Sequence, residues 1–315
     1  MRIAYLILAH RQPWQVARLV SRLSTNRPSS ETTFFIHVDK KTDEATYRQF
    51  TDSMHGFSNV HFVKRHVCHW AEFGLVRAAL EGIAEILRAP QPADYIVLLS
   101  GEDYPIKTND YINEFFERGA GRSYISHDTV PSSAWPQAAS RIGSWHAHLL
   151  GRPVLLGRTT LGASRKWPVV AVSYCLPRER RFPRGYQPYT GSAYWAMTRD
   201  AAQLVYDVSR SNRALLRFFK YTCCPDELFF QTVLLNSKLK AEIVDSDLHF
   251  IDWSRGGAHP LTLGAADLDR LAGSPALFAR KFDADVDETI LRLIDEKLLG
   301  TLPAGNDPEG ATAQR

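Results

Sequence analysis

A glutamate that follows proline and aspartate could act as a general base in this chain. The stretch Cys224–Glu227 reads Cys-Pro-Asp-Glu and precedes the apolar residues Leu228–Phe230. Pro225 suits the first turn of a helix, because its missing N–H would be unpaired there in any case. The helix dipole favours negative charge at that end, so we expect the Glu227 carboxylate to stay ionised and able to accept a proton. The alternative, which the local sequence alone favours, is that Glu227 only satisfies the start of the helix.

Polar side chains follow two apolar runs of the N-terminal half. His37 and Asp39 lie at the end of the run 33–38, and Glu102 and Asp103 follow the run 95–99. Strand-like runs that alternate with helical patterns predict a largely parallel sheet covered on both faces. Such sheets bind ligands beyond the carboxyl ends of their strands. We therefore expect these four side chains to lie at a ligand site.

Basic residues are concentrated between residues 141 and 184. They are Arg141, Arg152, Arg158, Arg165, Lys166, Arg178, Arg180, Arg181 and Arg184. Glu179 alone opposes them, so the segment carries about +8 while the remainder of the chain is mildly acidic. One interpretation is a solvated basic loop. The other is a surface that binds phosphates, acidic sugars or anionic lipid headgroups.

Length and composition limit the class of protein. A chain of 315 residues with 44% hydrophobic residues can bury a large core, as one large α/β domain or two smaller ones. The net charge of +4 is too small to indicate nucleic-acid binding. The sequence contains neither GxGxxG after the first strand nor GxxxxGK[ST], which argues against dinucleotide and P-loop sites.

The cysteines and the apolar N-terminus bear on location. Cys68, Cys175, Cys223 and Cys224 lack the spacing of a metal site or a disulfide framework, which favours a reducing compartment. The apolar run 3–9 is too short for a signal peptide or a membrane span. We expect a cytoplasmic protein that could contact the inner face of a membrane through the basic segment.

The apolar pattern predicts alternating elements, whereas the region 121–185 is irregular and the tail 303–315 is expected to be disordered. The predicted strands are 3–9, 33–38, 60–63, 95–99, 191–197 and 248–253. The predicted helices are 13–23, 70–87, one from Asp200, one at Glu227, and 285–299.

Five motifs in order resemble one enzyme family. They are His-Val-Asp-Lys-Lys at 37–41, LLSGEDYPIKT at 98–108, GSAYWAMTR at 191–199, PDELFF at 225–230 and RKFDADVD at 280–287. The family is the core-2/I-branching β-1,6-N-acetylglucosaminyltransferases with the peptide O-xylosyltransferases, and the resemblance covers residues 1 to about 298. It implies a Rossmann-like nucleotide-sugar transferase fold of GT-A type, with inversion at the anomeric carbon and no divalent metal. It also implies one domain at 1–300, with donor binding in 1–120 and acceptor binding and catalysis in 121–300.

The resemblance gives roles to three residues around the departing nucleotide. Glu227 matches the family's catalytic base, which takes the proton of the acceptor hydroxyl, and an ordinary carboxyl pKa suffices for this. Lys281 matches a lysine that faces the diphosphate of a UDP-sugar. Arg255 is the candidate for a second cation there, although the spacing around it departs from the branching enzymes. Two fixed cations would stand in place of a metal.

Other donor-site residues follow from the same resemblance. His37, Val38 and Asp39 resemble the uridine-binding strand end. Asp103 lies where metal-using relatives of this fold place Asp-x-Asp and could bind sugar or acceptor, or only close a turn before a proline. Trp70 could line the donor pocket or could be ordinary core.

Glu102, Tyr194 and Trp195 are the candidates on the acceptor side. Aromatic faces stack on sugar rings, but one of these two aromatic residues must point into the core, because side chains alternate along a strand. Ala193 resembles the branching enzymes and tilts the expected donor from xylose toward N-acetylglucosamine. The acceptor is expected to be a glycan, another carbohydrate or a peptide.

Two other functions remain open from the sequence. One is a sugar- or nucleotide-binding protein of the same fold without activity. The other is a metal-dependent transferase with Asp103 or Asp285 as a ligand, since Asp283–Asp287 contains Asp-x-Asp. Helix-capping acids explain that motif better, so we expect no metal and no cofactor besides the UDP-sugar substrate.

Overall fold

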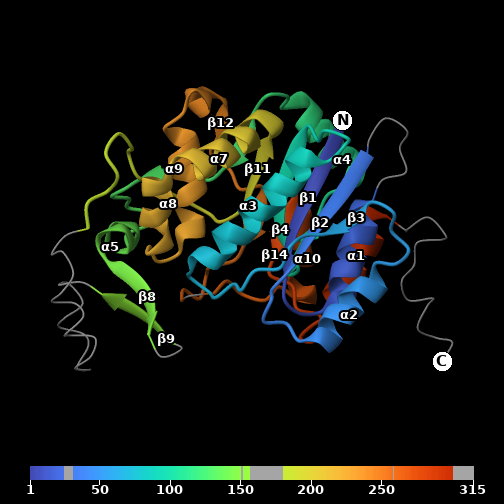
Figure 1. The fold of residues 1–315 in the computed structure, drawn as a ribbon. Helices are drawn as coiled ribbons and strands as arrows, with labels where there is room; N and C mark the ends of the chain where they lie inside the picture. Colours follow the sequence, from blue (N-terminus) through green and yellow to red (C-terminus); the bar gives the residue numbers. More distant parts are fainter. Residues whose placement is uncertain (25–30, 150–151, 157–179, 258, 301–315) are drawn as a thin grey trace.

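A seven-stranded, mostly parallel sheet forms the centre of the molecule in the computed structural model, which describes residues 1–24, 31–149, 152–156, 180–257 and 259–300 (Figure 1). The strand order is β12-β6-β11-β4-β1-β2-β3, and only β11 runs antiparallel to its neighbours. The strands are β1 (Arg2–Ala9), β2 (Glu31–Val38), β3 (Val60–Phe62), β4 (Tyr95–Ser100), β6 (Ser123–Ile125), β11 (Trp195–Thr198) and β12 (Ile243–Val244). The predicted α/β class with a largely parallel sheet is confirmed.

Helices cover both faces of this sheet. The α-helices are α1 (Pro13–Leu23), α2 (Glu44–Ser53), α3 (Phe73–Arg88), α4 (Asn109–Arg118), α5 (Ala138–Gly143), α7 (Arg199–Ser211), α8 (Arg213–Lys220), α9 (Phe229–Leu235), α10 (Leu268–Ala272) and α11 (Thr289–Ile294). Shorter turns are the 3₁₀-helices η2 (Pro225–Glu227), η3 (Lys238–Glu242) and η4 (Ala265–Asp267), and the π-helix η5 (Asp295–Leu299).

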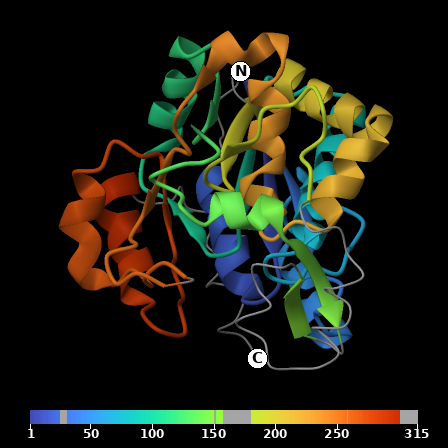
Figure 2. The same cartoon turned by 90° about the vertical axis from the view of Figure 1, so that its left-hand side faces the viewer.

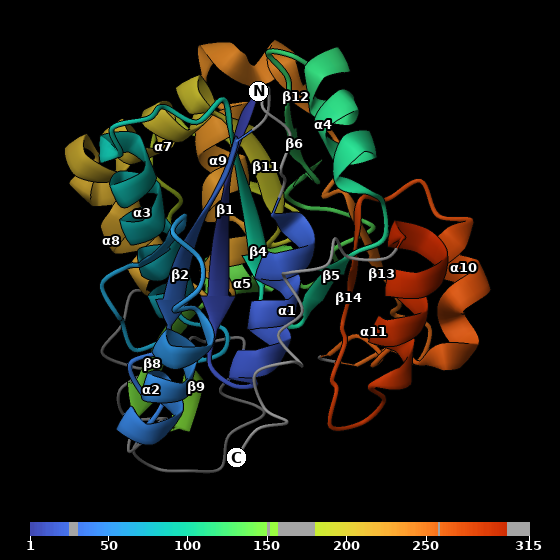
Figure 3. The same ribbon diagram turned by 90° about the vertical axis from the view of Figure 1, so that its right-hand side faces the viewer.

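Alternation along β1 divides the core into two layers. Ile3, Tyr5 and Ile7 pack with buried residues of α1, α4 and α11, whereas Ala4 and Leu6 pack with those of α3, α7 and α9. This is the side-chain period of a strand buried on both faces. Figure 3 shows α1 in front of the sheet and α3 on its other side.

A second sheet joins the C-terminal part of the chain to the end of β4. It contains β13 (His249–Ile251), β14 (Phe278–Arg280) and β5 (Asp103–Pro105) in that order. Its register places Arg280 opposite Asp103. Two-stranded pairs are formed by β7 (Asp128–Thr129) with β10 (Tyr189–Thr190) and by β8 (Trp145–Leu149) with β9 (Arg152–Leu156). The β8–β9 hairpin and helices α10 and α11 lie on opposite sides of the molecule (Figure 2).

Four predicted elements have different bounds for local reasons. Helix α3 begins at Phe73 rather than Trp70, because Ala71 has φ 64°. Strand β11 begins at Trp195, because Gly191 and Ser192 bond instead to residues 227–231. The late strand, β13, covers only His249–Ile251, within the predicted 248–253. The last helix begins at Thr289, whose N–H donates to the Asp287 carboxylate at 2.9 Å.

Two predictions concern residues that the structure does not describe, and a third concerns the division of the chain at residue 120. The tail 303–315 and residues 157–179 of the basic segment lie outside the described residues. The seven-stranded sheet takes strands from both sides of residue 120. The assignment of donor binding to residues 1–120, and of acceptor binding and catalysis to residues 121–300, stays a prediction.

Candidate functional site

The carboxyl ends of β1 and β4 meet where the strand order reverses. β1 pairs in parallel with β2 on one side and β4 on the other, so the point between β1 and β4 is the switch point at which such sheets bind ligands. His10 follows β1 and lies close enough to Glu102 and Asp39 for both charges to act on it. The predicted convergence of acids at this edge is therefore present.

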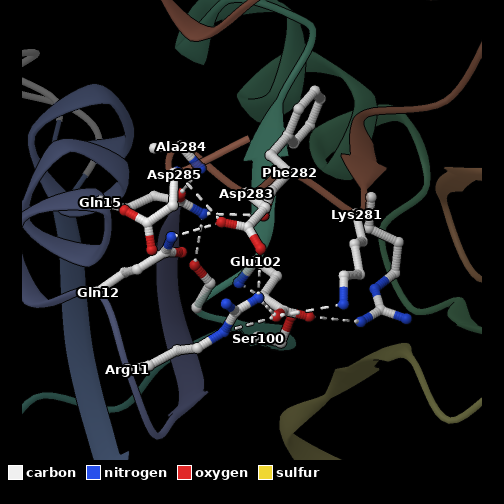
Figure 4. Close-up of polar contacts among 12 residues, drawn as sticks. Arg11, Gln12, Gln15, Ser100, Glu102, Lys281, Phe282, Asp283, Ala284 and Asp285 are labelled. Carbon is white, nitrogen blue, oxygen red and sulfur yellow. Dashed lines mark hydrogen bonds and ion pairs between the residues drawn. The ribbon is translucent and has the colours of Figure 1, made fainter. Parts of the chain in front are cut away.

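Glu102 lies between three cations from two parts of the chain, Arg11 after β1 and the adjacent Arg280 and Lys281 (Figure 4). Arg11 Nε donates to Glu102 Oε1 at 3.1 Å. Lys281 Nζ is 3.6 Å from the same oxygen, and Arg280 Nη2 is 3.8 Å from Glu102 Oε2. The carboxylate side chain is 14% exposed, so these contacts are partly shielded from water. Lys281 is thus held near the switch point by an acid that an incoming anion could replace.

Asp103 is fully buried and already has all its partners within the protein. Its oxygens accept hydrogen bonds from Ser100 N at 2.7 Å and Arg280 Nε at 3.0 Å. Burial works to raise the pKa of Asp103, but the His249 ring, whose Nε2 is 3.5 Å from Asp103 Oδ2, and the charge of Arg280 outweigh it and hold the pKa below its ordinary value. This geometry fits the turn-closing alternative, and donor binding by Asp103 stays a prediction.

Tyr194 and Trp195 point in opposite directions, as the alternation requires. Trp195 is 1% exposed and packs on Phe230 in the core, so an acceptor-stacking role for it is wrong. The Tyr194 ring lies beneath Arg280, 4.7 Å from its guanidinium carbon, and 4.6 Å from the His249 ring. Tyr194 therefore lies between the Glu102 cluster (Glu102 with Arg11, Arg280 and Lys281) and residues 190–191, which bind the backbone of Glu227.

The end of β2 holds the three residues predicted to bind uridine. His37 is buried and accepts a hydrogen bond from His66 N at 2.8 Å, and burial lowers its pKa to about 4. Asp39 Oδ1 accepts from Lys41 N at 2.9 Å. Val38 is also buried. The three residues are ordered by the protein itself, and their contact with a nucleotide stays a prediction.

A hollow of about 540 Å³ lies beside these strand ends, between α1 and α2. Its lining residues are His10, Arg11, Gln12, Pro13, Trp14, Lys41, Thr42, Asp43, Thr46, Gln49 and Asp285. Trp14 is 41% exposed there. Arg11 lines this hollow and also contacts Glu102, so the two sites are neighbours.

Backbone contacts fix the position of Glu227. Its carbonyl oxygen accepts from Gly191 N at 2.9 Å and from Thr190 Oγ1 at 3.2 Å. A Cβ on Gly191 would lie 1.8 Å from the carbonyl oxygen of Ser126, so only glycine fits this close approach. The GSAYW motif thus holds the PDELFF motif in place.

The Glu227 side chain pairs with Arg141 at the end of α5. The Arg141 guanidinium bonds directly to the carboxylate, and the two side chains are 20% and 26% exposed. Burial raises the pKa of Glu227, and Arg141 opposes this rise. Burial and the neighbouring Glu227 raise the pKa of Asp226 to about 7. Contrary to the expectation of a helix start and an ordinary pKa, Glu227 ends a 3₁₀ turn and α9 begins at Phe229.

Trp70 lies on the surface close to the Glu227 segment. It is 58% exposed, so the core alternative is wrong. The carbonyl oxygen of the next residue, Ala71, accepts from Cys224 N at 3.0 Å, and the Trp70 ring is 5.8 Å from that of His259. Trp70 is thus available to a ligand between the 224–227 turn and the loop that carries His259.

Arg255 lies on that same loop. A hydrogen bond from Leu261 N to Asp252 O at 2.9 Å closes the loop, and Leu263 N donates to Lys281 O at 2.9 Å. Arg255 is exposed, and the described residues give it no ion pair. Its loop therefore contacts the backbone of Lys281, whereas the basic side chains beside Glu102 are those of Arg11, Arg280 and Lys281.

Acids considered as metal ligands have partners within the protein. Asp283 accepts from Gln12 Nε2 at 2.6 Å and from Arg11 at 2.9 Å (Figure 4), and Asp287 accepts from Ala265 N at 2.8 Å. Asp285 differs: its backbone N–H donates to Asp283 Oδ1 at 3.2 Å, and the residue lines the hollow between α1 and α2. Within the described ranges, no group of three or more His, Cys, Asp or Glu side chains could hold a metal ion.

The described part of the basic segment contains two arginines that face the protein itself. Arg141 pairs with Glu227, and Arg180 is buried with its guanidinium on the carbonyls of Ser144 and Tyr221 at 3.1 and 2.9 Å. For these two, a solvated loop is the wrong description. No helix in the described residues is long and apolar enough to span a bilayer. Membrane contact and cytoplasmic location stay predictions.

Sequence reasoning missed three basic residues of this site. Arg11, Arg141 and Arg280 were not singled out as partners of acids, although Arg280 adjoins Lys281 and Arg11 follows the first strand. Arg141 gave no local signal, because 86 residues separate it from Glu227.

A family model and several curated proteins match the sequence. The model described as "Core-2/I-Branching enzyme" matches residues 3–271. Human Xylosyltransferase 2 is 27% identical over 324 residues, which cover 97% of this chain and 34% of that protein. Xylosyltransferase oxt of Drosophila melanogaster is 26% identical over 323 residues, covering 95% and 34%. The chain spans about a third of the length of these curated relatives.

Solved structures give more distant likenesses. The galactosyltransferase LgtC in complex with donor and acceptor sugar analogs has a TM-score of 0.44 and 9% identity, over 96% of this chain and 98% of that one. Mouse Xyloside xylosyltransferase 1 in its apo form has a TM-score of 0.43 and 11% identity, over 89% and 97%.

Proposed function

The chain belongs to the core-2/I-branching enzyme family, and from that premise we propose that it is an inverting glycosyltransferase with Glu227 as its general base. The donor is a UDP-sugar carrying N-acetylglucosamine or xylose, and the acceptor is a hydroxyl of a glycan or a peptide. One observation carries this proposal: the half-buried Glu227 carboxylate is held on a backbone-fixed turn, and Arg141, paired with it, opposes the rise of its pKa. The same turn contacts Ala71, next to the exposed Trp70.

The reaction requires one proton transfer and one displacement. Glu227 takes the proton of the acceptor hydroxyl while that oxygen bonds to the anomeric carbon. The bond between that carbon and the diphosphate oxygen breaks from the opposite face, and UDP leaves with the bonding electrons. In this proposal Lys281 exchanges Glu102 for the departing diphosphate and neutralises its charge, and Arg255 is the second cation.

Charge arrangements support a reaction without a metal. Arg11, Arg280 and Lys281 already surround Glu102, and the Asp103 carboxylate is bound to Ser100 and Arg280. A UDP-sugar panel with purified protein, read by UDP release in the presence and absence of excess EDTA, tests the proposal. We expect release to depend on one donor and an acceptor and to be unchanged by EDTA. Loss of release with EDTA, restored by Mg²⁺ or Mn²⁺, would identify a metal-dependent transferase.

Arg141 is expected to set the pH dependence of this reaction. The base must be ionised, so activity is lost as pH falls through the Glu227 pKa, which burial raises and Arg141 restrains. Arg141→Gln removes the restraint, so the acidic limb of kcat/KM should move to higher pH, with a larger loss at pH 6 than at pH 8. Arg141→Lys keeps the charge and should restore most of the profile. If the acidic limb of the kcat/KM profile does not move in Arg141→Gln, Arg141 has no influence on the ionisation of Glu227.

A further inference from the structure

Two adjacent cysteines lie directly before the Glu227 turn. The Sγ atoms of Cys223 and Cys224 are 3.9 Å apart. Cys224 is buried with φ 48°, its N–H donates to Ala71 O at 3.0 Å, and its carbonyl accepts from Glu227 N at 3.2 Å. Cys223 is partly exposed. The Cys223 thiol is therefore accessible, whereas Cys224 is buried and its backbone helps to position Glu227.

A buried imidazole and an arginine lie around Cys223. His146 is 5% exposed, and neither of its ring nitrogens has a hydrogen-bond partner within the described ranges. The backbone N–H of His146 donates to the Tyr221 carbonyl oxygen at 2.9 Å, which fixes β8 beside the cysteines. Arg141 acts on Cys223 from α5 while it contacts Glu227. Unsatisfied imidazole nitrogens and a guanidinium are the surroundings in which thiolates are stabilised.

Charges of both signs act on the Cys223 sulfur. The contact with the Cys224 sulfur and the positive charge of Arg141 outweigh burial and lower the pKa of Cys223. The carboxylates of Asp226 and Glu227 face the same sulfur and oppose this. Cys68 is the internal contrast, because it is also partly exposed but burial raises its pKa to about 12.

We propose that Cys223 is a reactive thiolate, and that its covalent modification by small disulfides or other soft electrophiles stops the reaction at Glu227. In the disulfide case the thiolate attacks one sulfur, the reagent's S–S bond breaks, and the other sulfur leaves as a thiolate. The product is a mixed disulfide on Cys223, which excess dithiothreitol reverses.

The consequence for the catalytic base follows from the shared arginine. Modification removes the negative charge of the Cys223 sulfur and adds a bulky group beside Arg141. Arg141 then has to move, and its contact with the Glu227 carboxylate is lost. Only this last step rests on the proposed function, whereas the reactivity of the thiol does not.

The reactivity test is a pH profile of labelling on the full chain. Dithiodipyridine is added between pH 5.5 and 8, and labelled peptides are quantified by mass spectrometry. Cleavage after Lys220 and Lys238 places Cys223 and Cys224 in one peptide, apart from Cys68 and Cys175. We expect the Cys223 rate to change less than about threefold over this range, because the thiolate fraction is nearly constant. An ordinary thiol slows about tenfold per pH unit in the same range. A Cys223 rate that follows Cys68 would overturn the proposal.

Substitutions separate the two sulfurs. Cys223→Ser should abolish the pH-independent labelling. Cys224→Ala removes the S–H donor, so Cys223 should remain reactive but lose rate toward low pH. Equal profiles for Cys224→Ala and the unsubstituted protein would show that the pairing of the sulfurs has no role.

The effect on function has its own measurement. Loss of transfer should track the modified fraction of Cys223 and reverse with dithiothreitol, while UDP binding measured by calorimetry is retained. Full modification of Cys223 without loss of transfer would overturn the proposed control of catalysis. Inhibition of Cys223→Ser by the same reagent to the same extent would overturn it as well. The labelling profile is also measured on Glu227→Gln, where it should stay flat, so a failure of the catalytic assignment is distinguishable from a failure at the thiol.

Discussion

Replacing Glu227 with glutamine is expected to lower turnover by about 10²–10⁴-fold while the affinity for UDP changes little. Glutamine keeps the size of the side chain and can still contact Arg141, but it cannot take a proton from an acceptor hydroxyl. The backbone contacts to Gly191 and Thr190 do not involve the side chain, so the turn should remain folded. Turnover is measured by UDP release with saturating donor and acceptor, and UDP affinity by calorimetry.

Glu242→Gln is the matched control, because Glu242 is an exposed glutamate at the end of η3. Its turnover should equal that of the unsubstituted protein. Thermal unfolding of both variants shows whether a loss comes from the chemistry or from the fold. Unchanged turnover in Glu227→Gln would remove Glu227 from the mechanism, whereas an equal loss of UDP affinity would assign it to donor binding.

The central sheet was predictable because its strands carry their own signal. β1 and β4 contain long apolar runs, β2 contains the apolar stretch 34–36, and α1 has the predicted bounds from Pro13 to Leu23. The small sheet β13-β14-β5 carried far less information, since none of its strands exceeds three residues. Arg280 therefore meets Asp103 through a pairing between distant segments that no local pattern encodes.

The environment of Glu227 shows the same limit. Proline followed by two acids fits a helix start, but Cys224 in a left-handed conformation turns the chain into a 3₁₀-helix instead. The carboxylate then depends on Arg141 rather than on helix N–H groups. The motif located the residue, while its pKa and its partner depend on tertiary contacts that local sequence does not contain.

Lys281→Met is expected to lower kcat by about 10²–10³-fold, with a smaller change in the KM for the donor. In the free protein Lys281 Nζ is 3.6 Å from Glu102, and in the reaction it would follow the charge that develops on the leaving diphosphate. An interaction that strengthens toward the transition state affects kcat more than ground-state binding. The measurement is initial UDP release across donor concentrations at saturating acceptor.

Stability is expected to change little in this variant, because Arg11 and Arg280 remain beside Glu102 and a partly exposed ion pair contributes about 0–1 kcal/mol. Lys297→Met, at an exposed lysine of η5, is the control for loss of a positive charge. Arg255→Met tests the second proposed cation and should resemble Lys281→Met if its loop brings it to the diphosphate. A rise in donor KM at constant kcat in Lys281→Met would instead mean that the lysine only binds the donor, and the charge of the leaving group would need another partner.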